Sequence, residues 1–354
     1  MIEFEKKYNF AIYDLNHRII KKSKYYDEEL VRSNNFYDNN AKIINLHGKV
    51  IRFKKCNLDD GYFIILYTTS KDMIKSKKRF SFVLDTVKYF ANNFLIERKE
   101  IEAPLKKQYG ILVHNMKSLN AHIQQEVYNV IPQEKLVNSL ENKIEVIENL
   151  IKSRTKDSAK AILKILHSST GLKMEFSVYS KLFHSNPTLS KNIHSIHKVL
   201  LNILYGFFPD FTDRHIKVNV SQSYAKGYFD YESVHVAFYY VLENAVKYVK
   251  NDSEINIYFE NNESELYIYF EMISLKILED EKDKIFDEGY SGSYAKEKKL
   301  SGTGLGMSRA KKILELNEGT ISIKTSSDDI YSEDYQKNTI KITLPMANKG
   351  STTL

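Results

Sequence analysis

Three glycines at alternate positions, Gly302, Gly304 and Gly306, stand directly before a run of residues with helical spacing. The chain has only 13 glycines among 354 residues, so three within five positions indicate a local need for glycine. Glycine lets backbone NH groups approach a ligand closely, and the start of a helix attracts anions. The stretch therefore suits a polyphosphate, although a flexible turn before an ordinary helix is the alternative when it is taken alone.

A predicted helix upstream, YYVLENAVKYV (residues 239–249), carries polar groups that complement such a ligand. Asn244, Lys247 and Tyr248 fall on or near one face of this helix. An amide oxygen can coordinate Mg²⁺, a lysine can neutralise phosphate and a tyrosine can stack on a base. An asparagine in an apolar helix is costly without a partner, which favours a role over the alternative of a polar helix rim.

A third candidate group is His114, in the predicted helix YGILVHNMKSLNAHIQQEVY (residues 109–128). With Leu112 and Met116 as core positions, His114 falls on the outward side, where its imidazole is an exposed nucleophile. An ordinary surface histidine is the alternative. His122 lies nearer the apolar seam, and we interpret it as a packing residue.

Two helices with apolar residues at alternating steps of three and four must position His114. The first follows Pro104, Pro132 interrupts the pattern, and the second extends through Ile151. We expect an antiparallel hairpin. Because an isolated hairpin would expose its apolar stripes, a four-helix bundle formed by two chains is expected, with an intramolecular partner helix as the alternative.

The flanking regions have different patterns. The N-terminal region mixes strands and helices, with hairpin turns expected at residues 47–48 and 60–61. Near the C-terminus, helices alternate with strands, which indicates an α/β sandwich. The predicted fold class is therefore α/β, with a mixed α+β N-terminal domain, a helical hairpin and a C-terminal α/β sandwich. The expected divisions are 1–98 (input domain), 99–170 (hairpin), 171–187 (linker), 188–346 (sandwich) and 347–354 (tail).

Composition excludes several classes of protein. The net charge is +7, but only KSKKR (residues 75–79) is densely basic, so a nucleic-acid partner is not expected. Cys56 is the single cysteine, which excludes an internal disulfide and a thiolate-rich metal site. No stretch approaches the roughly 18 to 20 apolar residues that span a bilayer, and the first residues do not resemble a secretory signal. A cytoplasmic protein without a membrane span is expected.

ENAVKY (243–248), IFDEGYSG (285–292) and GTGLGM (302–307), in this order, resemble the ATP-binding domain of sensor histidine kinases. That superfamily is shared with gyrase, Hsp90 and MutL, and the resemblance covers residues 188–346. It implies that Asn244 binds Mg²⁺, that Phe286 anchors a lid at residues 291–301, and that this lid is ordered by nucleotide. The residues implied in ATP binding are Asn244, Lys247, Tyr248, Phe286, Gly302, Gly304, Leu305 and Gly306.

The order His-x-x-Lys-Ser, formed by His114, Lys117 and Ser118, resembles the histidine box of the same kinases. The resemblance implies that His114 is the phosphoacceptor. Asn115 stands where many of these kinases have an acidic residue that orients the imidazole and accepts its proton. Because an amide is a poor base, we expect slow phosphorylation or a base supplied from elsewhere.

Two further positions depart from the family pattern. Tyr240 replaces the first asparagine of the family's asparagine box. In the first glycine box, Met272, Ser274 and Lys276 stand where Asp, Gly and Gly are expected, and the family's aspartate binds the adenine amino group. Methionine is a weak acceptor, and losing such a bond costs roughly 1.5 to 3 kcal/mol. We expect weakened or altered nucleotide binding, unless a shift in register lets Glu271 substitute.

The resemblance implies a sensor histidine kinase that uses ATP and Mg²⁺ to phosphorylate its own histidine. It would pass the phosphoryl group to a separate response regulator, because the chain has no receiver-like segment of its own. Residues 1–98 would be the input domain, weakly similar to a PAS-type sensor. Met272, Tyr240 and Asn115 favour the alternative, a degenerate nucleotide-binding scaffold or phosphatase-like regulator.

Overall fold

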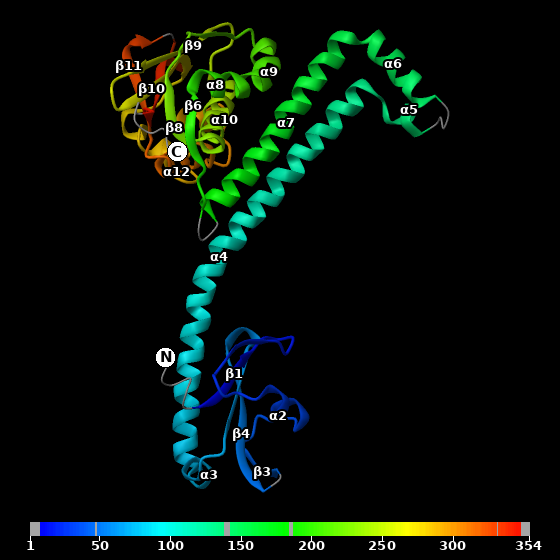
Figure 1. Cartoon of the computed structure of the whole chain (residues 1–354), viewed down its shortest axis with the longest axis vertical. Coiled ribbons are helices and arrows are strands. Elements are labelled where there is room, and N and C mark those ends of the chain that lie inside the picture. The colour runs from blue at the N-terminus through cyan, green and yellow to red at the C-terminus, as the bar shows by residue number, and fades with distance from the viewer. Residues whose placement is uncertain (1–7, 47, 138–141, 184–186, 331, 348–354) are drawn as a thin grey trace, which may run out of the picture. The chain divides into compact units, whose positions relative to one another are not determined.

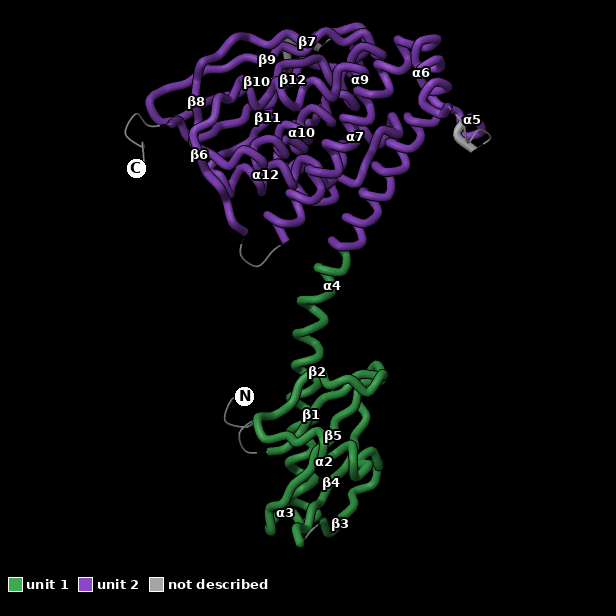
Figure 2. Tube along the Cα trace, turned by 45° about the vertical axis from the view of Figure 1, so that its right-hand side comes forward, with its two compact units in different colours: residues 1–107 green, residues 108–354 purple. Residues whose placement is uncertain are grey.

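The computed structural model describes residues 8–46, 48–137, 142–183, 187–330 and 332–347 (Figure 1). The chain forms two compact units, residues 1–107 and 108–354 (Figure 2). The first contains an antiparallel sheet, and the second contains an α/β sandwich together with most of a helical hairpin. The fold class expected from the sequence is therefore confirmed, whereas the five-part division remains a prediction.

The first unit is built on a five-stranded antiparallel sheet with the order β2-β1-β5-β4-β3. Successive residues of β1 point to opposite faces, so Phe10 and Ile12 join one apolar cluster while Ala11 and Tyr13 join another. Asp60, with φ of 55°, makes the expected turn before β5, whereas His47 of the other expected turn lies outside the described residues. The elements are β1 (Asn9–Tyr13), β2 (Ile19–Lys22), α2 (Glu28–Ser33), β3 (Lys42–Leu46), β4 (Lys49–Asn57), β5 (Phe63–Thr68) and α3 (Lys71–Lys75).

The hairpin begins with a single long helix, α4 (Lys77–Val130), which continues through Pro104. Proline in a helix removes one backbone hydrogen bond, to the carbonyl of Glu100. Glu100 is exposed, so water can satisfy that carbonyl. After α4 the chain continues through α5 (Gln133–Val137), α6 (Lys143–Ser153) and α7 (Thr155–Leu182). Residues 171–182, expected as part of a linker, belong to α7.

The sandwich contains a five-stranded sheet with the order β11-β12-β10-β9-β7, in which only the β7–β9 pair is parallel. A second sheet pairs β6 with β8, and Ile193 lies in its first strand. The strands are β6 (Lys191–Ser195), β7 (Lys217–Val220), β8 (Lys226–Asp230), β9 (Glu254–Asn261), β10 (Glu265–Leu275), β11 (Thr320–Ile330) and β12 (Tyr335–Pro345). The helices are α8 (Ile196–Leu204), α9 (Phe208–Asp213), α10 (Tyr231–Tyr248), α11 (Ser293–Glu297) and α12 (Gly306–Leu316).

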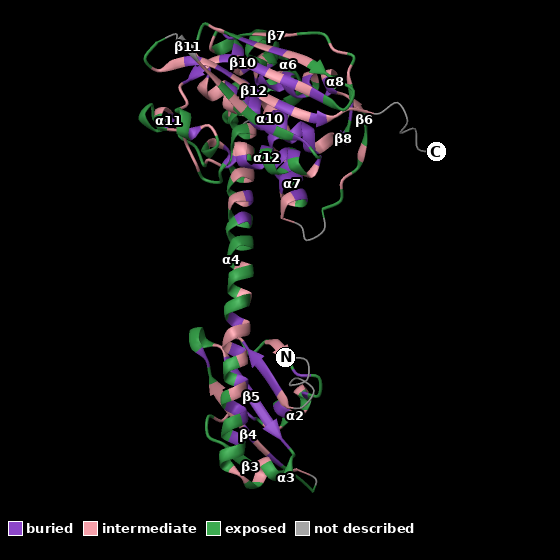
Figure 3. Ribbon diagram, turned by 90° about the vertical axis from the view of Figure 1, so that its left-hand side faces the viewer, coloured by how far each residue is buried: buried purple, intermediate pink, exposed green. Residues whose placement is uncertain are grey.

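The core of the sandwich lies between the sheet and its helices (Figure 3). Alternate residues of β10 are buried. The ring of Phe270 packs edge to face against the ring of Phe238 on α10, with the ring centroids 5.8 Å apart. Asp230 caps α10 by accepting a hydrogen bond from the backbone NH of Ser233 at 2.8 Å, and it pairs with buried Lys181 at 2.8 Å. These contacts fix the helix that carries the candidate binding residues. Within the described part of the chain, no helix is long and apolar enough to cross a membrane.

Candidate functional site

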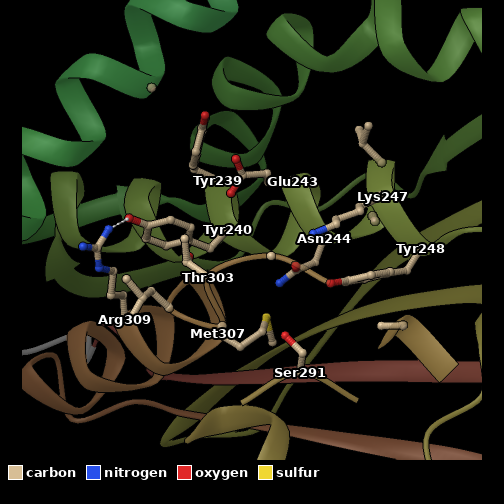
Figure 4. A pocket seen from close by; sticks show the side chains of 18 of the residues that line it. Tyr239, Tyr240, Glu243, Asn244, Lys247, Tyr248, Ser291, Thr303, Met307 and Arg309 are labelled. Carbon is tan, nitrogen blue, oxygen red and sulfur yellow. Dashed lines mark hydrogen bonds between the residues drawn. The ribbon is translucent and has the colours of Figure 1, made fainter. Parts of the chain in front are cut away.

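A cavity of about 680 Å³ lies in the second unit (Figure 4). It is bounded by α10, by the segment 302–306 (the glycine loop), by the end of β10 and by the facing parts of α4 and α7. Most of the residues expected to bind nucleotide border it. Its lining includes Asn115, Ser118, His122, Glu175, Tyr240, Glu243, Asn244, Lys247, Tyr248, Met272, Ser274, Gly302, Gly304, Leu305, Gly306 and Arg309.

The glycine loop is closely packed, most tightly at Gly304. A Cβ atom at Gly302 would lie 2.7 Å from the Lys247 Nζ atom, so the ammonium group rests directly on the loop. Gly304 has φ of +67°, its carbonyl accepts a hydrogen bond from the Gly289 NH at 3.0 Å, and an added Cβ would lie 2.5 Å from Tyr290 O. Position 304 therefore requires glycine, and the loop joins a cation to the start of α12 at one end of the cavity.

The face of α10 completes this cationic end. Asn244 reaches from the helix toward the glycine loop (Figure 4). Within the described structure its side-chain amide makes no hydrogen bond, so its oxygen is available to a ligand. Burial lowers the pKa of Lys247, while Glu243 acts in the opposite direction. Tyr248 donates a hydrogen bond to the Leu300 carbonyl at 3.4 Å, which ties α10 to the segment before the loop.

Glu243 brings a carboxyl group into the same cavity. The Glu243 side chain is exposed to the cavity. The protein groups around it nevertheless displace much of the water from its carboxyl group, and this desolvation raises the pKa of Glu243 to about 7. The Glu175 carboxylate raises it further, while Lys247 and Arg309 lower it. A carboxyl group with this pKa exchanges its proton near neutral pH.

A buried polar network joins four helices beside the cavity. Arg309 of α12 donates to both carboxylate oxygens of Glu175 on α7, at 3.0 and 3.1 Å, and to the Tyr240 hydroxyl at 3.0 Å. Asn115 of α4 donates to Glu175 Oε1 at 3.0 Å. Tyr240 is only 4% exposed, and burial raises the pKa of its phenol. The tyrosine that replaces the family's asparagine is therefore a structural partner of Arg309 and Glu175.

One face of α4 also borders the cavity. Asn115, Ser118 and His122 line it, whereas His114 is exposed and lies outside this lining, and Lys117 is exposed. The interpretation of His122 as a packing residue is wrong, because its side chain is exposed and faces the cavity. The spacing of 115, 118 and 122 places these residues on one helical face.

The sheet wall of the cavity contains Met272 and Ser274, 5% and 7% exposed. The strand register places Glu271 on the opposite face of the sheet, where it pairs with Lys337 at 3.1 Å. Glu271 therefore cannot replace the missing aspartate. Ile340 and Ile323 of the neighbouring strands make this end of the cavity apolar.

The segment that contains the expected lid (residues 291–301) and the residues just before it are held by contacts of their own. Phe286 is buried in the core and lies outside the cavity lining, with the Lys311 ammonium 6.0 Å from its ring. The Glu281 carboxylate accepts hydrogen bonds from the Ser293 NH at 2.8 Å and from the Tyr290 hydroxyl at 2.8 Å. Leu305 lines the cavity, and its carbonyl accepts a hydrogen bond from the Arg309 NH at 3.0 Å.

Sequence reasoning did not identify Glu175, Arg309, Glu243 or His122 as residues of this site. Glu175 and Arg309 carried no distinguishing signal, because other charged residues such as Lys173 and Lys311 lie in the same helices. Such charges are rarely buried unless they are paired. Their partner could not be found from spacing, because 134 positions separate them in the chain.

Comparisons with known proteins agree with this geometry. Residues 229–348 match the sequence family described as histidine kinase-, DNA gyrase B-, and HSP90-like ATPase. The chain is 25% identical over 166 residues to the signal transduction histidine-protein kinase ArlS of Staphylococcus aureus (strain USA300), covering 47% of this chain and 34% of ArlS. The match thus spans about a third of that relative's length.

The comparison with solved structures found only remote similarities. The mycobacterial sensor histidine kinase MprB has 16% identity and a TM-score of 0.38, covering 45% of this chain and 99% of that one. Histidine kinase ThkA, crystallised in complex with the response regulator TrrA, has 12% identity and a TM-score of 0.39, covering 98% of both chains. From the sequence family, residues 229–348 are a histidine kinase-like ATPase domain, in a chain distantly related to sensor histidine kinases.

Proposed function

We propose that this protein is a histidine kinase that uses ATP and Mg²⁺ to phosphorylate His114 and then passes the phosphoryl group to a response regulator. One observation supports this proposal most strongly. The cavity that holds Asn244, Lys247 and the glycine loop is also lined by Asn115 and Ser118, which lie one and four residues after the expected acceptor on α4. A nucleotide in this cavity would therefore lie beside the helix that carries His114.

The cavity residues fit a magnesium triphosphate. Lys247 and the backbone NH groups of the glycine loop supply positive charge and donors for phosphate oxygens. In the described part of the chain no three His, Cys, Asp or Glu side chains gather to hold a metal. Magnesium would therefore depend on the Asn244 oxygen and on the phosphates themselves, as is common for this ion.

The chemistry assigned to His114 is nucleophilic. One imidazole nitrogen forms a bond to the γ-phosphorus as the bond to the β,γ-bridging oxygen breaks, and ADP leaves with that electron pair. The imidazole proton must pass to a base. Asn115 is unsuited to this because its amide already donates to Glu175 and amides are poor bases. Slow turnover is therefore part of the proposal.

A homodimer and an external acceptor protein complete the proposal. Several large apolar side chains on α7 remain exposed, and a second copy of the hairpin would cover them. They are Ile162, Leu163, Leu166 and Phe176. The acceptor would be a response regulator, the class of protein with which ThkA was crystallised.

The second candidate function is a nucleotide-binding scaffold without kinase activity. It is favoured by Met272 in the cavity wall, by Tyr240 in the buried network and by Asn115 beside the histidine. With these residues the cavity is still present, but it lacks the aspartate, the first asparagine and the acidic residue beside the histidine that the family pattern contains.

Radioactive labelling separates the two functions. The full-length protein is incubated with Mg²⁺ and ATP labelled at the γ-phosphate, and the label is tested for acid lability and alkali stability. A kinase gives such a label in the wild type, and His114→Gln abolishes it. Bound ATP without label favours the scaffold.

His122→Gln is the matched control, because His122 lies on the same helix and faces the cavity. The proposal expects this variant to retain its label. If His122→Gln removes the label while His114→Gln keeps it, the acceptor assignment is wrong.

A further inference from the structure

One contact joins α4 directly to the sandwich, six residues before His114. Gln108 Nε2 donates a hydrogen bond to Glu288 Oε1 at 3.1 Å, and Gln108 is only 9% exposed. Lys312 of α12 donates to the other oxygen of Glu288 at 3.0 Å. Glu288 is therefore held between α4 and α12. It is also the neighbour of Gly289, whose NH donates to the glycine loop at 3.0 Å.

A second contact reaches the residue directly after His114, through α7. Asn115 Nδ2 donates to Glu175 Oε1 at 3.0 Å, and the same carboxylate accepts hydrogen bonds from Arg309 at 3.0 and 3.1 Å. Glu175 and Arg309 are 8% and 5% exposed, so little water competes for these bonds. The helix that carries His114 is thus tied to the sandwich on both sides of this residue.

The two contacts fix the rotation of this part of α4 about its own axis. Gln108 and Asn115 are seven residues apart, which places them on one face of the helix together with buried Leu112. Each residue advances about 100° around an α-helix, so His114 is turned by about 100° from Asn115 and by about 120° from Gln108. His114 is accordingly exposed and lies outside the cavity lining. A γ-phosphate in the cavity would face Asn115 and Ser118 instead.

The contact at Gln108 carries a cost that favours its opening. The Gln108 Nε2 atom must face the Glu288 carboxylate, because an ionised carboxylate can only accept hydrogen bonds. The Oε1 atom of Gln108 is then buried, and among the described residues it has no hydrogen-bond partner. An unpaired buried acceptor is unfavourable, and water would reach it once α4 turns. The contact therefore suits a closed state that can be released.

We propose that the two contacts form an autoinhibitory clamp, which keeps His114 turned away from a bound nucleotide and must open before phosphoryl transfer. The clamp rests on the proposed function, because it requires a nucleotide in the cavity and an acceptor at His114. Its two anchors on the sandwich both adjoin the glycine loop. Glu288 precedes Gly289, which binds this loop, and the backbone NH of Arg309 donates to the Leu305 carbonyl. A triphosphate that shifts the loop would therefore act on both contacts at once.

Initial rates of labelling by γ-labelled ATP test the clamp in the full-length protein. Gln108→Leu removes the donor to Glu288 and the unpaired oxygen but keeps an apolar side chain of similar size. We expect the label on His114 to form roughly tenfold faster or more, with the affinity for the β,γ-imido analogue of ATP unchanged. Gln124→Leu is the matched control, because Gln124 is an exposed glutamine on the same helix, and it should change neither quantity.

Locking the same contact tests the clamp in the opposite direction. Gln108→Cys and Glu288→Cys are combined with Cys56→Ser, which removes the single native cysteine. A short, cleavable cross-linker then joins the two introduced thiols. The cross-linked protein should bind the ATP analogue but lose the label, and cleavage of the cross-linker should restore the label. Because one protein is compared before and after cleavage, any effect of the substitutions on folding is the same in both samples.

The outcomes separate the clamp from the proposed function. If Gln108→Leu is labelled at the wild-type rate or more slowly, the clamp is overturned while the kinase function survives. Equal rates in the cross-linked and the cleaved protein overturn it as well, and this result does not depend on whether Gln108→Leu folds. If His114 is labelled in none of these proteins although all of them bind the ATP analogue, the kinase function fails and the clamp fails with it.

Discussion

The proposed phosphate end of the cavity, formed by Asn244, Lys247 and the glycine loop, keeps the family's residues, whereas the proposed base end, formed by Met272, Ser274 and Lys276, does not. The phosphate end keeps the asparagine, the lysine and the three glycines that the resemblance implies, in a geometry where Lys247 rests on the loop. The base end has none of the three residues expected from the first glycine box, because Met272, Ser274 and Lys276 stand in place of Asp, Gly and Gly. One cavity thus combines a retained half and an altered half.

The difference follows from how each half recognises its ligand. Phosphates would be bound by backbone NH groups of a loop in which Gly304 leaves no room for a side chain, so a change at that position distorts the site. A base edge is read by one or two side chains. Replacing one of them changes which base is favoured but leaves the cavity intact. The comparison predicts that substitutions at the phosphate end change affinity for all nucleotides, whereas those at the base end change the preference among them.

The largest effect is expected where the network supports the phosphate end. Arg309→Met leaves the buried Glu175 carboxylate without its cation, which should lower the free energy of unfolding by about 3–5 kcal/mol. Urea unfolding followed by circular dichroism measures it. The double variant with Glu175→Met should recover part of the loss. A loss below about 1 kcal/mol in the single variant would show that the network does not stabilise this end.

Gly304→Ala should have the next largest effect. Its φ of +67° and the 2.5 Å approach to Tyr290 O leave no room for a methyl group, so the loop must move. Left-handed backbone alone costs about 1–2 kcal/mol, and with the steric clash we expect about 100-fold weaker binding of ATP and GTP alike. Calorimetry measures both affinities.

Gly306→Ala is the matched control for this loop. The added methyl group would meet only the Tyr240 ring, at 3.2 Å, so a few-fold loss is expected. If Gly304→Ala changed the ATP-to-GTP ratio instead of both affinities, the separation of the two ends would be incorrect.

The smallest effect concerns the pH dependence that Glu243 introduces. Its folded-state pKa of about 7 lies above the ordinary value of 4.5, so the folded state holds a proton that the unfolded chain has already released. Stability therefore falls as pH rises from about 4.5 to 7. The fall should be on the order of 1 kcal/mol, because water in the cavity screens the group.

Glu243→Gln should flatten this slope, as measured by denaturant unfolding at pH 5 and pH 8. An identical slope in the variant would place the pH dependence elsewhere. Because Gln keeps the size of Glu, the comparison isolates the charge.

The fold class could be predicted from the sequence, and Asn244, Lys247 and the three glycines do border one cavity, whereas their roles in binding remain predictions. Strand alternation and helical spacing are local signals, and Gly302, Gly304 and Gly306 fall within five positions. The network of Glu175, Arg309 and Tyr240 could not be predicted, because its members meet only after four helices pack.

The hydrogen bond between Ser274 and Asn338 was hidden for a related reason. It depends on Asn338, 64 positions away on the adjacent strand, and on the carbonyl that fixes the amide of Asn338. Sequence spacing does not reveal the direction of a hydrogen bond. By contrast, the expectation that Glu271 and Met272 point to opposite faces is confirmed, because alternation along a strand is local.

The most direct measurement compares ligands that carry phosphates with ligands that lack them. The full-length protein is titrated calorimetrically, with Mg²⁺, against the β,γ-imido analogues of ATP and GTP and against adenosine and guanosine. We predict that both triphosphate analogues bind and that neither nucleoside is detected at millimolar concentration, because the phosphate end supplies most of the affinity. Absence of binding by both analogues, or nucleosides that bind as tightly as the analogues, would contradict this account.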